Sequence, residues 1–554
     1  MKRNRITNSI EPLEARIAPA VFVVNLLGDT STVTTGKMTL RQAINAANMK
    51  GGNNTIVFAP GLHGVIDLAS GVLDIDSKLT IDGPGGNRII IDAVGNSGVF
   101  SIMNEAVTLN GLTIVDGTGG GINSMGPLTI DDCLIAGFEG TVRGGVSDFT
   151  SGAFILRDSI VSGNSAQSGG GLGGGVYASA GGGVQIIDSK IIGNSTGGTG
   201  GGLFAMVGGT GTGNIVISGS VISGNFAGGG AGGAFLTEVS TSPGKIVVSN
   251  SLVSGNSSGT SGNGGGSFLS SVGPVSIKGT SFTDNSTSGS LLQGGGLWVG
   301  GTGAAVIAGS RFSGNSAGLG GGIWLGGSNS VTIQGCSIFD NHGVNGAGIG
   351  GDGSFNLTLS GTTVSANNAS DLGGGIGLTD TGVTKITGSI ISDNVAFSGG
   401  GAYLIGSGPM TIQSTHVLGN SASDSNVSGG GLVFDSTSED IALIADVIAR
   451  NSGTGNGGGM FIGSTGNVTI TGGSVTGNSA LGEGGGIFIG ASANAVINAP
   501  GVHITGNVAG GEGGGVAHAH GSTGSVVLNP STITGNVAAG GQFALFENTY
   551  GAFS

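Results

Sequence analysis

The chain has 554 residues, of which 125 are glycine and only 10 are proline, and no strict Gly-X-Y triplet is present, which excludes collagen. Val, Ile and Leu recur in short runs, which are not typical of a disordered glycine-rich linker. Charged residues make up 9% of the chain, and beyond residue 50 ten Lys/Arg face twenty-eight Asp/Glu, so nucleic acid is not an expected partner.

Residues 1–20 are expected to form a sorting segment that precedes the folded part. Lys2, Arg3 and Arg5 give it a basic start, followed by the sequence EPLEARIAPA at residues 11–20. This stretch resembles the Leu-Glu-Pro-Arg type of N-terminal motif of large exported repeat proteins from planctomycete-like bacteria, with Ala15 in place of the proline. The resemblance implies export. No run of 18 or more apolar residues occurs, so no transmembrane helix is expected.

Residues 21–92 are predicted to form an N-terminal cap and the first turns of the fold. A strand is predicted at Val21–Val24, and Thr39 is a good N-cap for a helix at Leu40–Met49. One face of this helix is apolar at i, i+3, i+4 and i+7, which suits a helix lying across the open end of a hydrophobic core. The residues of this face are Leu40, Ala43, Ile44 and Ala47.

The cap carries a second resemblance. The sequence MTLRQAI at residues 38–44, followed by strands at residues 53–58 and 79–83, resembles the Cys-Ser-Leu-Arg-Glu-Ala domain that opens many bacterial β-helix proteins. Met38 replaces the cysteine of that motif and Gln42 replaces the glutamate.

Residues 93–540 are dominated by one repeated pattern, in which an apolar residue, two small or polar residues and an asparagine are usually followed by glycines. The spacing between asparagines is 26 to 31 residues, a period typical of a solenoid. The asparagines are Asn164, Asn194, Asn225, Asn256, Asn285, Asn315, Asn341, Asn367, Asn394, Asn420, Asn451, Asn478, Asn507 and Asn536.

The offsets within the repeat predict where each residue points. Three residues before each asparagine, from Val161 to Ile533, every residue is apolar, which indicates an inward stack. Six residues before it, glycine, aspartate or asparagine is frequent, as expected at a bend that needs positive φ. The asparagine amides themselves are expected to stack at ~4.8 Å and to hydrogen-bond from turn to turn.

After the glycines, a further strand shows strict alternation. Its first and third positions are chiefly aliphatic and are expected to point inward, whereas its middle position is often aromatic and should point outward. An exposed ridge of rings would suit a sugar face or the apolar patch of a partner protein. The alternative is that the rings stabilise the sheet and a neighbouring loop covers them. These candidate partner-binding residues are Tyr177, Phe204, Phe268, Trp298, Trp324, Tyr403, Phe461 and Phe488.

Together these features predict an all-β fold, a right-handed parallel β-helix of the pectate-lyase-like kind with about three strands per turn and a short N-terminal capping helix. The motifs Gly232–Phe235 and Phe282–Asn285 resemble the Gly-Gly-Ala-Ile and Phe-x-x-Asn repeats of the polymorphic outer membrane proteins. That resemblance implies a surface-exposed adhesin. Eighteen residues follow Asn536, so no C-terminal membrane barrel is expected, and residues 541–554 are expected to be a tail or cap.

One group of residues points to a metal ion. Asp132, Asp158 and Asp188 occupy the same bend in three successive turns, with Arg157 nearby, and carboxylates at this spacing could share calcium. The alternative is that aspartate simply suits a tight bend. No cofactor other than calcium is expected, and no catalytic residue is assigned.

The sequence favours a non-catalytic, secreted or cell-surface protein, associated with the outer membrane, with an adhesive or structural role. Surface polysaccharide or another protein is the expected partner. The alternative is a polysaccharide-active lyase or hydrolase, for which the Asp132–Asp188 region would have to supply the charged groups.

Overall fold

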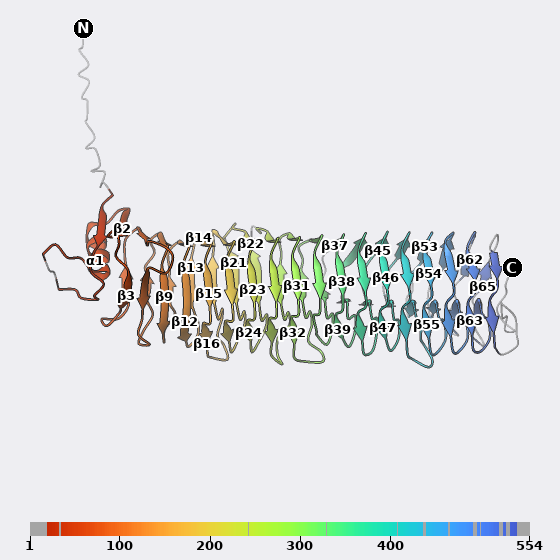
Figure 1. The fold of residues 1–554 in the computed structure, drawn as a ribbon. Helices are drawn as coiled ribbons and strands as arrows, with labels where there is room; N and C mark the ends of the chain where they lie inside the picture. The colour runs from red at the N-terminus through yellow and green to blue at the C-terminus, as the bar shows by residue number, and fades with distance from the viewer. Residues whose placement is uncertain are drawn as a thin grey trace, which may run out of the picture.

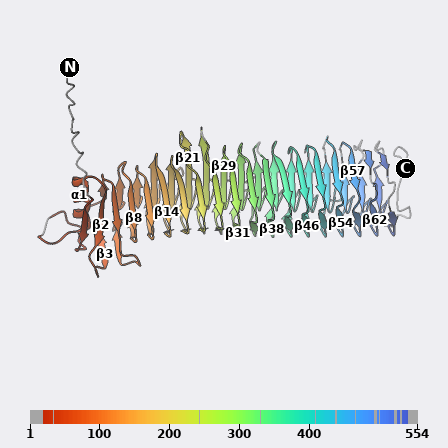
Figure 2. The ribbon, with the colours of Figure 1, turned by 90° about the horizontal axis from the view of Figure 1, so that it is seen from above.

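A computed structural model describes residues 19–539, apart from residues 33–34, 242, 328–329, 407, 436–438, 464–465, 491–495, 499, 520–524 and 528–531. The predicted sorting segment, except its last two residues, and the predicted C-terminal tail lie outside the described residues. The described chain winds into one long rod, with helix α1 at one end and successive turns stacked along the axis (Figure 1). A view turned by 90° shows the same regular stacking (Figure 2).

One turn shows how the repeat is built. Strands β30 (Val275–Lys278), β31 (Ser281–Thr283) and β33 (Leu297–Gly301) belong to three different sheets, which we call sheets I, III and II. The two-residue strand β32 (Ser286–Thr287) follows the asparagine, before the glycine-rich loop. Each strand pairs in parallel with its counterpart one turn on, as β30 does with β34 (Ala305–Ala308). The right-handed parallel β-helix is therefore confirmed.

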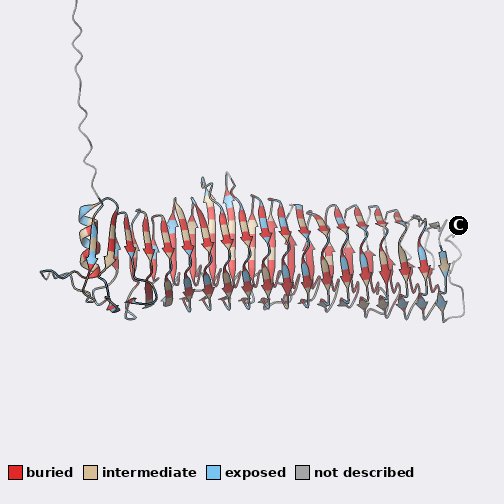
Figure 3. Ribbon diagram, turned by 45° about the horizontal axis from the view of Figure 1, so that its top comes forward, coloured by how far each residue is buried: buried red, intermediate tan, exposed pale blue. Residues whose placement is uncertain are grey.

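The core of the rod is one continuous apolar cluster that runs along the axis. Buried and accessible residues alternate along the strands, as two-residue periodicity requires (Figure 3). The predicted inward stack is confirmed: all its members from Val161 to Ile504 are at most 2% exposed, and Ile533 is partly buried against the same cluster. This stack lies on the central residues of the short strands of sheet III, such as Phe282 in β31.

The asparagine ladder is also confirmed. Each asparagine Nδ2 from Asn164 to Asn507 donates to Oδ1 of the asparagine in the next turn at 2.9–3.1 Å. The backbone N–H of Asn315 donates to the same Asn341 Oδ1, at 3.1 Å, and Asn315 Nδ2 also reaches the carbonyl of Phe282 in the preceding turn. These amides are buried and satisfied, so their role is structural.

A second ladder, which the sequence interpretation did not predict, lies five residues before most of the asparagines from Asn164 to Asn451. Here a side-chain oxygen accepts the backbone N–H of the equivalent residue one turn earlier, as Ser189 Oγ does from Ser159 at 3.2 Å. Cys133 and Cys336 occupy rungs of this ladder and are buried free thiols. Burial raises the pKa of Cys133 to about 12, so both cysteines belong to the packed wall of the rod rather than to a redox site.

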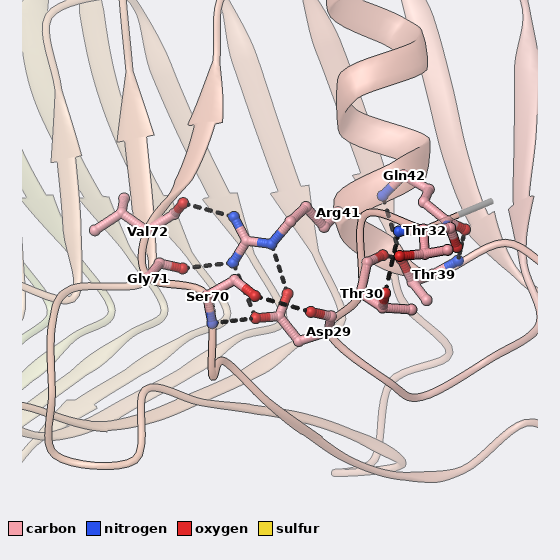
Figure 4. Close-up of polar contacts among 9 residues, drawn as sticks. All are labelled: Asp29, Thr30, Thr32, Thr39, Arg41, Gln42, Ser70, Gly71 and Val72. Atoms are coloured by element: carbon pink, nitrogen blue, oxygen red, sulfur yellow. Dashed lines mark hydrogen bonds and ion pairs between the residues drawn. The ribbon is translucent and has the colours of Figure 1, made fainter.

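Helix α1 (Leu40–Lys50) has the predicted cap and the predicted buried face of Leu40, Ala43, Ile44 and Ala47. Thr39 and Gln42 form a reciprocal capping box. Arg41 forms an ion pair with the buried Asp29 and donates to the carbonyls of Gly71 and Val72 (Figure 4). Arg41 thereby ties the helix to the loop before β4 (Leu73–Ile75), which pairs with the next turn in sheet II.

Candidate functional site

The aromatic residues lie in one register of sheet II, on strands that begin directly after the glycine runs. Phe268 pairs with Trp298, and Trp298 pairs with Trp324, between strands β29 (Ser267–Ser271), β33 and β36 (Ile323–Gly326). None of the predicted aromatic residues belongs to the main core cluster, so they point away from the interior as predicted. Tyr403, Phe461 and Phe488 instead form a separate cluster with Val433.

The predicted exposure of this ridge is wrong. Tyr177, Phe204, Trp324, Tyr403, Phe461 and Phe488 are all buried, with Trp324 only 6% exposed, and Phe268 and Trp298 are half-buried. The ridge is therefore a second packed layer outside the sheet rather than an open surface.

The glycine-rich loops provide this cover. The Trp298 indole Nε1 donates to Oε1 of the loop residue Gln293 at 3.0 Å, and Leu372 and Val427 from later loops pack against the Tyr403 cluster. The loop comes so close to the strand that a Cβ on Gly399, which has φ +67°, would lie 2.7 Å from the Ala402 carbonyl oxygen. Glycine is required here because a side chain would push the loop off the rings.

Within this layer the rings stack face to face along the rod. From Tyr177 to Trp298 the centroids of successive rings are 4.1–5.2 Å apart, with interplanar angles of 4–11°. Phe235, missing from the predicted set, is a member of this stack, and its position after Gly232-Gly233-Ala234 could have identified it. Arg143 lies over Phe149 and Tyr177 at the start of the stack, 4.2 and 4.7 Å from the ring centroids.

The column is interrupted at two consecutive turns. Gly350 in β40 (Ile349–Asp352) pairs with Trp324 on one side and with Gly377 in β44 (Ile376–Thr379) on the other, and Gly377 pairs with Tyr403 in β48 (Ala402–Ile405). A cavity of about 150 Å³ lies at this interruption, between Trp324 and Tyr403. The sequence signal was glycine in the aromatic register of two adjacent repeats.

The three aspartates of the predicted calcium site lie on the bend between sheets I and III. Asp132, Asp158 and Asp188 are exposed and have φ of 47–48°, which agrees with the alternative that aspartate suits this bend. The Asp132 carboxylate lies against Gly85 in a preceding turn, whereas the Asp188 carboxylate lies against Gly219 in the following turn. Over the described part of the chain, no three His, Cys, Asp or Glu side chains converge as metal ligands. The calcium site stays a prediction.

The basic residue of this region is already paired. Arg157 forms a bidentate ion pair with Asp131 of the preceding turn, and its Nε lies 3.8 Å from Asp158 Oδ2. The Asp131 carboxylate raises the pKa of Arg157, which keeps the guanidinium charged. The two charges neutralise each other at the C-terminal ends of strands β11 (Leu128–Asp131) and β14 (Ala153–Arg157).

Comparison with models of known protein families agrees with the architecture. The family model described as "Right handed beta helix region" matches residues 240–422, which include both tryptophans and both glycines of the interruption. Tailspike protein 3 of bacteriophage CBA120 is a similar solved structure, with 13% identity and a TM-score of 0.25, covering 93% of this chain and 60% of the tailspike.

The PL6 family alginate lyase AlyGC is similar with 11% identity and a TM-score of 0.16, covering 94% of this chain and 100% of the lyase. No curated protein matches the sequence. No helix among the described residues is long and apolar enough to cross a membrane.

Proposed function

We propose that this chain is a non-catalytic, secreted or cell-surface rod with an adhesive role, which attaches to surface polysaccharide through its outer layers. The observation that supports this most is the stack of Phe235, Phe268 and Trp298 in the aromatic layer, because these three rings are only half-buried and follow one another along a stiff axis, as the linear repeat of a glycan chain would require. The asparagine ladder supplies the stiffness, since it ties each turn to its neighbours.

The charge of the chain narrows the range of expected partners. The formal net charge is −14, so a neutral glycan meets less repulsion at this surface than a polyanion does. Export to the cell surface, with loose attachment to the outer membrane, is the location that the N-terminal motif and the repeats support.

A polysaccharide-active enzyme is the second candidate, favoured by the row of exposed carboxylates beside Arg157. Calcium held between Asp132, Asp158 and Asp188 would be part of that function. The aspartates would bind the ion, and the ion would bind the acidic groups of a substrate.

One experiment separates the two candidates. The purified protein is mixed with insoluble neutral and acidic polysaccharides, with calcium or with a chelator, and both sedimentation of the protein and new chain ends are measured. The proposal expects co-sedimentation with a neutral polysaccharide and no new reducing or unsaturated ends. New ends formed by the wild type and lost in an Asp158→Asn variant would instead establish the enzyme.

A further inference from the structure

The interruption of the aromatic column at Gly350 and Gly377 creates a space that we call the ring slot: the volume beside Gly351 and Gly377, between Trp324 and Tyr403. Trp324 and Tyr403 are three turns apart, which corresponds to ~14 Å along the axis. Trp324 fills part of this length, because its Cε3 lies 2.6 Å from where a Cβ on Gly350 would be. The remaining cavity of about 150 Å³ is of the size that holds one six-membered ring.

The walls of the ring slot are amphipathic. Its two ends are aromatic side chains, and the loop residues Leu319 and Leu372 form an apolar side. A further side carries the polar residues Asp352 and Thr379, which stand two residues after Gly350 and Gly377 and therefore share their outward face, with Ile405 next in the same row. Neither the Asp352 carboxylate nor the Thr379 hydroxyl has a hydrogen-bond partner among the residues that the structure describes.

We propose that the ring slot binds a single neutral pyranose ring of a glycan. The inference rests on the adhesive function above and names its site. A pyranose has the shape of the missing aromatic ring, with C–H groups on its faces to pack against Trp324 and Tyr403 and hydroxyls on its edge. The Asp352 carboxylate accepts hydrogen bonds from those hydroxyls, and a hydrogen bond to a charged group is stronger than one between neutral groups.

The charges around Tyr403 set the preference for a neutral sugar. Burial and the nearby carboxylates of Asp435, Asp371 and Asp424 raise the pKa of Tyr403, and its hydroxyl donates to Asp435 Oδ2 at 3.2 Å. The same carboxylates repel the carboxylate of a uronic acid. They also favour the hydroxyl-rich edge of a sugar over the apolar edge of an aromatic side chain from a partner protein, because a carboxylate accepts hydrogen bonds from hydroxyl groups and an aromatic edge offers none.

The chain offers its own reporter of binding. Trp298 and Trp324 are the only tryptophans of the sequence, so a Trp298→Phe variant leaves Trp324 as the single emitter. The substitution is mild, because phenylalanine already fills the same register at Phe204, Phe235 and Phe268. Trp324 emission is then followed while methyl glucopyranoside or methyl galactopyranoside is added. The expected result is a saturable shift with a dissociation constant on the order of 1 mM, as for a small ligand.

Two variants in this background test the walls, each with a matched control. Tyr403→Leu removes one end of the slot, and Phe461→Leu makes the same change two turns further along the column. Asp352→Asn changes the polar side, and Asp380→Asn is its control on an exposed bend outside the slot. Tyr403→Leu and Asp352→Asn are each expected to weaken binding by about tenfold, and the controls are expected to bind as before.

The proposal is overturned if neither glycoside shifts the emission, if open-chain sorbitol or galacturonate gives an equal shift, or if Tyr403→Leu and Asp352→Asn bind unchanged. Binding of N-acetylphenylalanine amide without binding of glycosides would assign the slot to a partner protein and would also overturn it. Sedimentation with polysaccharide distinguishes failure of the ring-slot proposal from failure of the proposed adhesive function. If the Tyr403→Leu rod still co-sediments, the adhesive function stands without the slot, whereas glycoside binding without co-sedimentation removes the adhesive function alone.

Discussion

Asp148 allows a test of protein stability that does not rest on the proposed function. It lies in β13 (Val146–Thr150), points into the core, and pairs with Ser124 of the preceding turn and Ala178 of the following turn. Its side chain is fully buried, and within the described residues neither carboxylate oxygen is hydrogen-bonded. Burial raises the pKa of Asp148 from 3.8 to about 7. The Ser124 hydroxyl of the neighbouring strand opposes only part of this rise, because it donates its proton to the Gly126 carbonyl rather than to the carboxylate.

The sign of the effect follows from linkage. Because the pKa is higher in the folded state, the folded protein holds this proton more tightly than the unfolded chain does. The stabilisation by protonated Asp148 is complete below about pH 4 and is lost progressively as the pH rises to about 7. A shift of about three pKa units at about 1.4 kcal/mol each gives a loss of about 4 kcal/mol over this range.

An Asp148→Asn variant removes this titration while keeping the size of the side chain. We expect the variant to match the wild type near pH 4 and to unfold at a higher temperature than the wild type above pH 7. Thermal unfolding followed by circular dichroism between pH 4 and 8 measures the difference. Burial also raises the pKa of Asp446, to about 6. Asp446 titrates in both proteins, so its contribution to the pH dependence of stability cancels in the comparison.

The control for Asp148→Asn is Asp67→Asn, which changes an exposed aspartate of β3 (Gly64–Asp67). Its melting curves should stay parallel to those of the wild type at every pH. If the curves of Asp148→Asn also stay parallel to the wild type, the carboxylate is either solvated or paired, and the reasoning is refuted.

Three further results are expected. Asn315→Ala should lower the free energy of unfolding by about 2–4 kcal/mol in denaturant titrations, because it leaves the backbone N–H of Asn285 unsatisfied in the core. An unchanged midpoint would contradict the structural role of the ladder. Cys133 and Cys336 should not react with a thiol reagent until the protein is denatured, and rapid labelling of the folded protein would show that the wall opens. Deletion of residues 38–50 should uncover the first turn and cause association in analytical ultracentrifugation, and a strictly monomeric variant would argue against the capping role.

Much of the fold could be predicted because the same residue types recur at the same positions in successive repeats. The inward stack, the asparagine ladder and the direction of the aromatic strand all follow from offsets that recur in every turn. The capping helix was predicted to within one residue, since Thr39 and the four-residue apolar face define its start and its buried side. Local chemistry and two-residue alternation suffice for these features.

The exposure of the rings could not be predicted in the same way. Alternation shows which face of a strand Trp324 occupies, but a loop covers that face only because Gly320 lets the backbone come close, and this is a tertiary contact. The ring slot was missed for a related reason. Gly350 and Gly377 look like further members of the glycine runs, and only the strand register places them in the aromatic column.

The direction of the asparagine ladder affects the whole rod. Every link runs the same way, from Nδ2 of one turn to Oδ1 of the next, so the amide dipoles are aligned along the axis and polarise one another. A broken rung therefore weakens the rungs on both sides as well as its own. The rod gains a built-in polarity from this alignment, and its turns are expected to melt in blocks rather than one at a time.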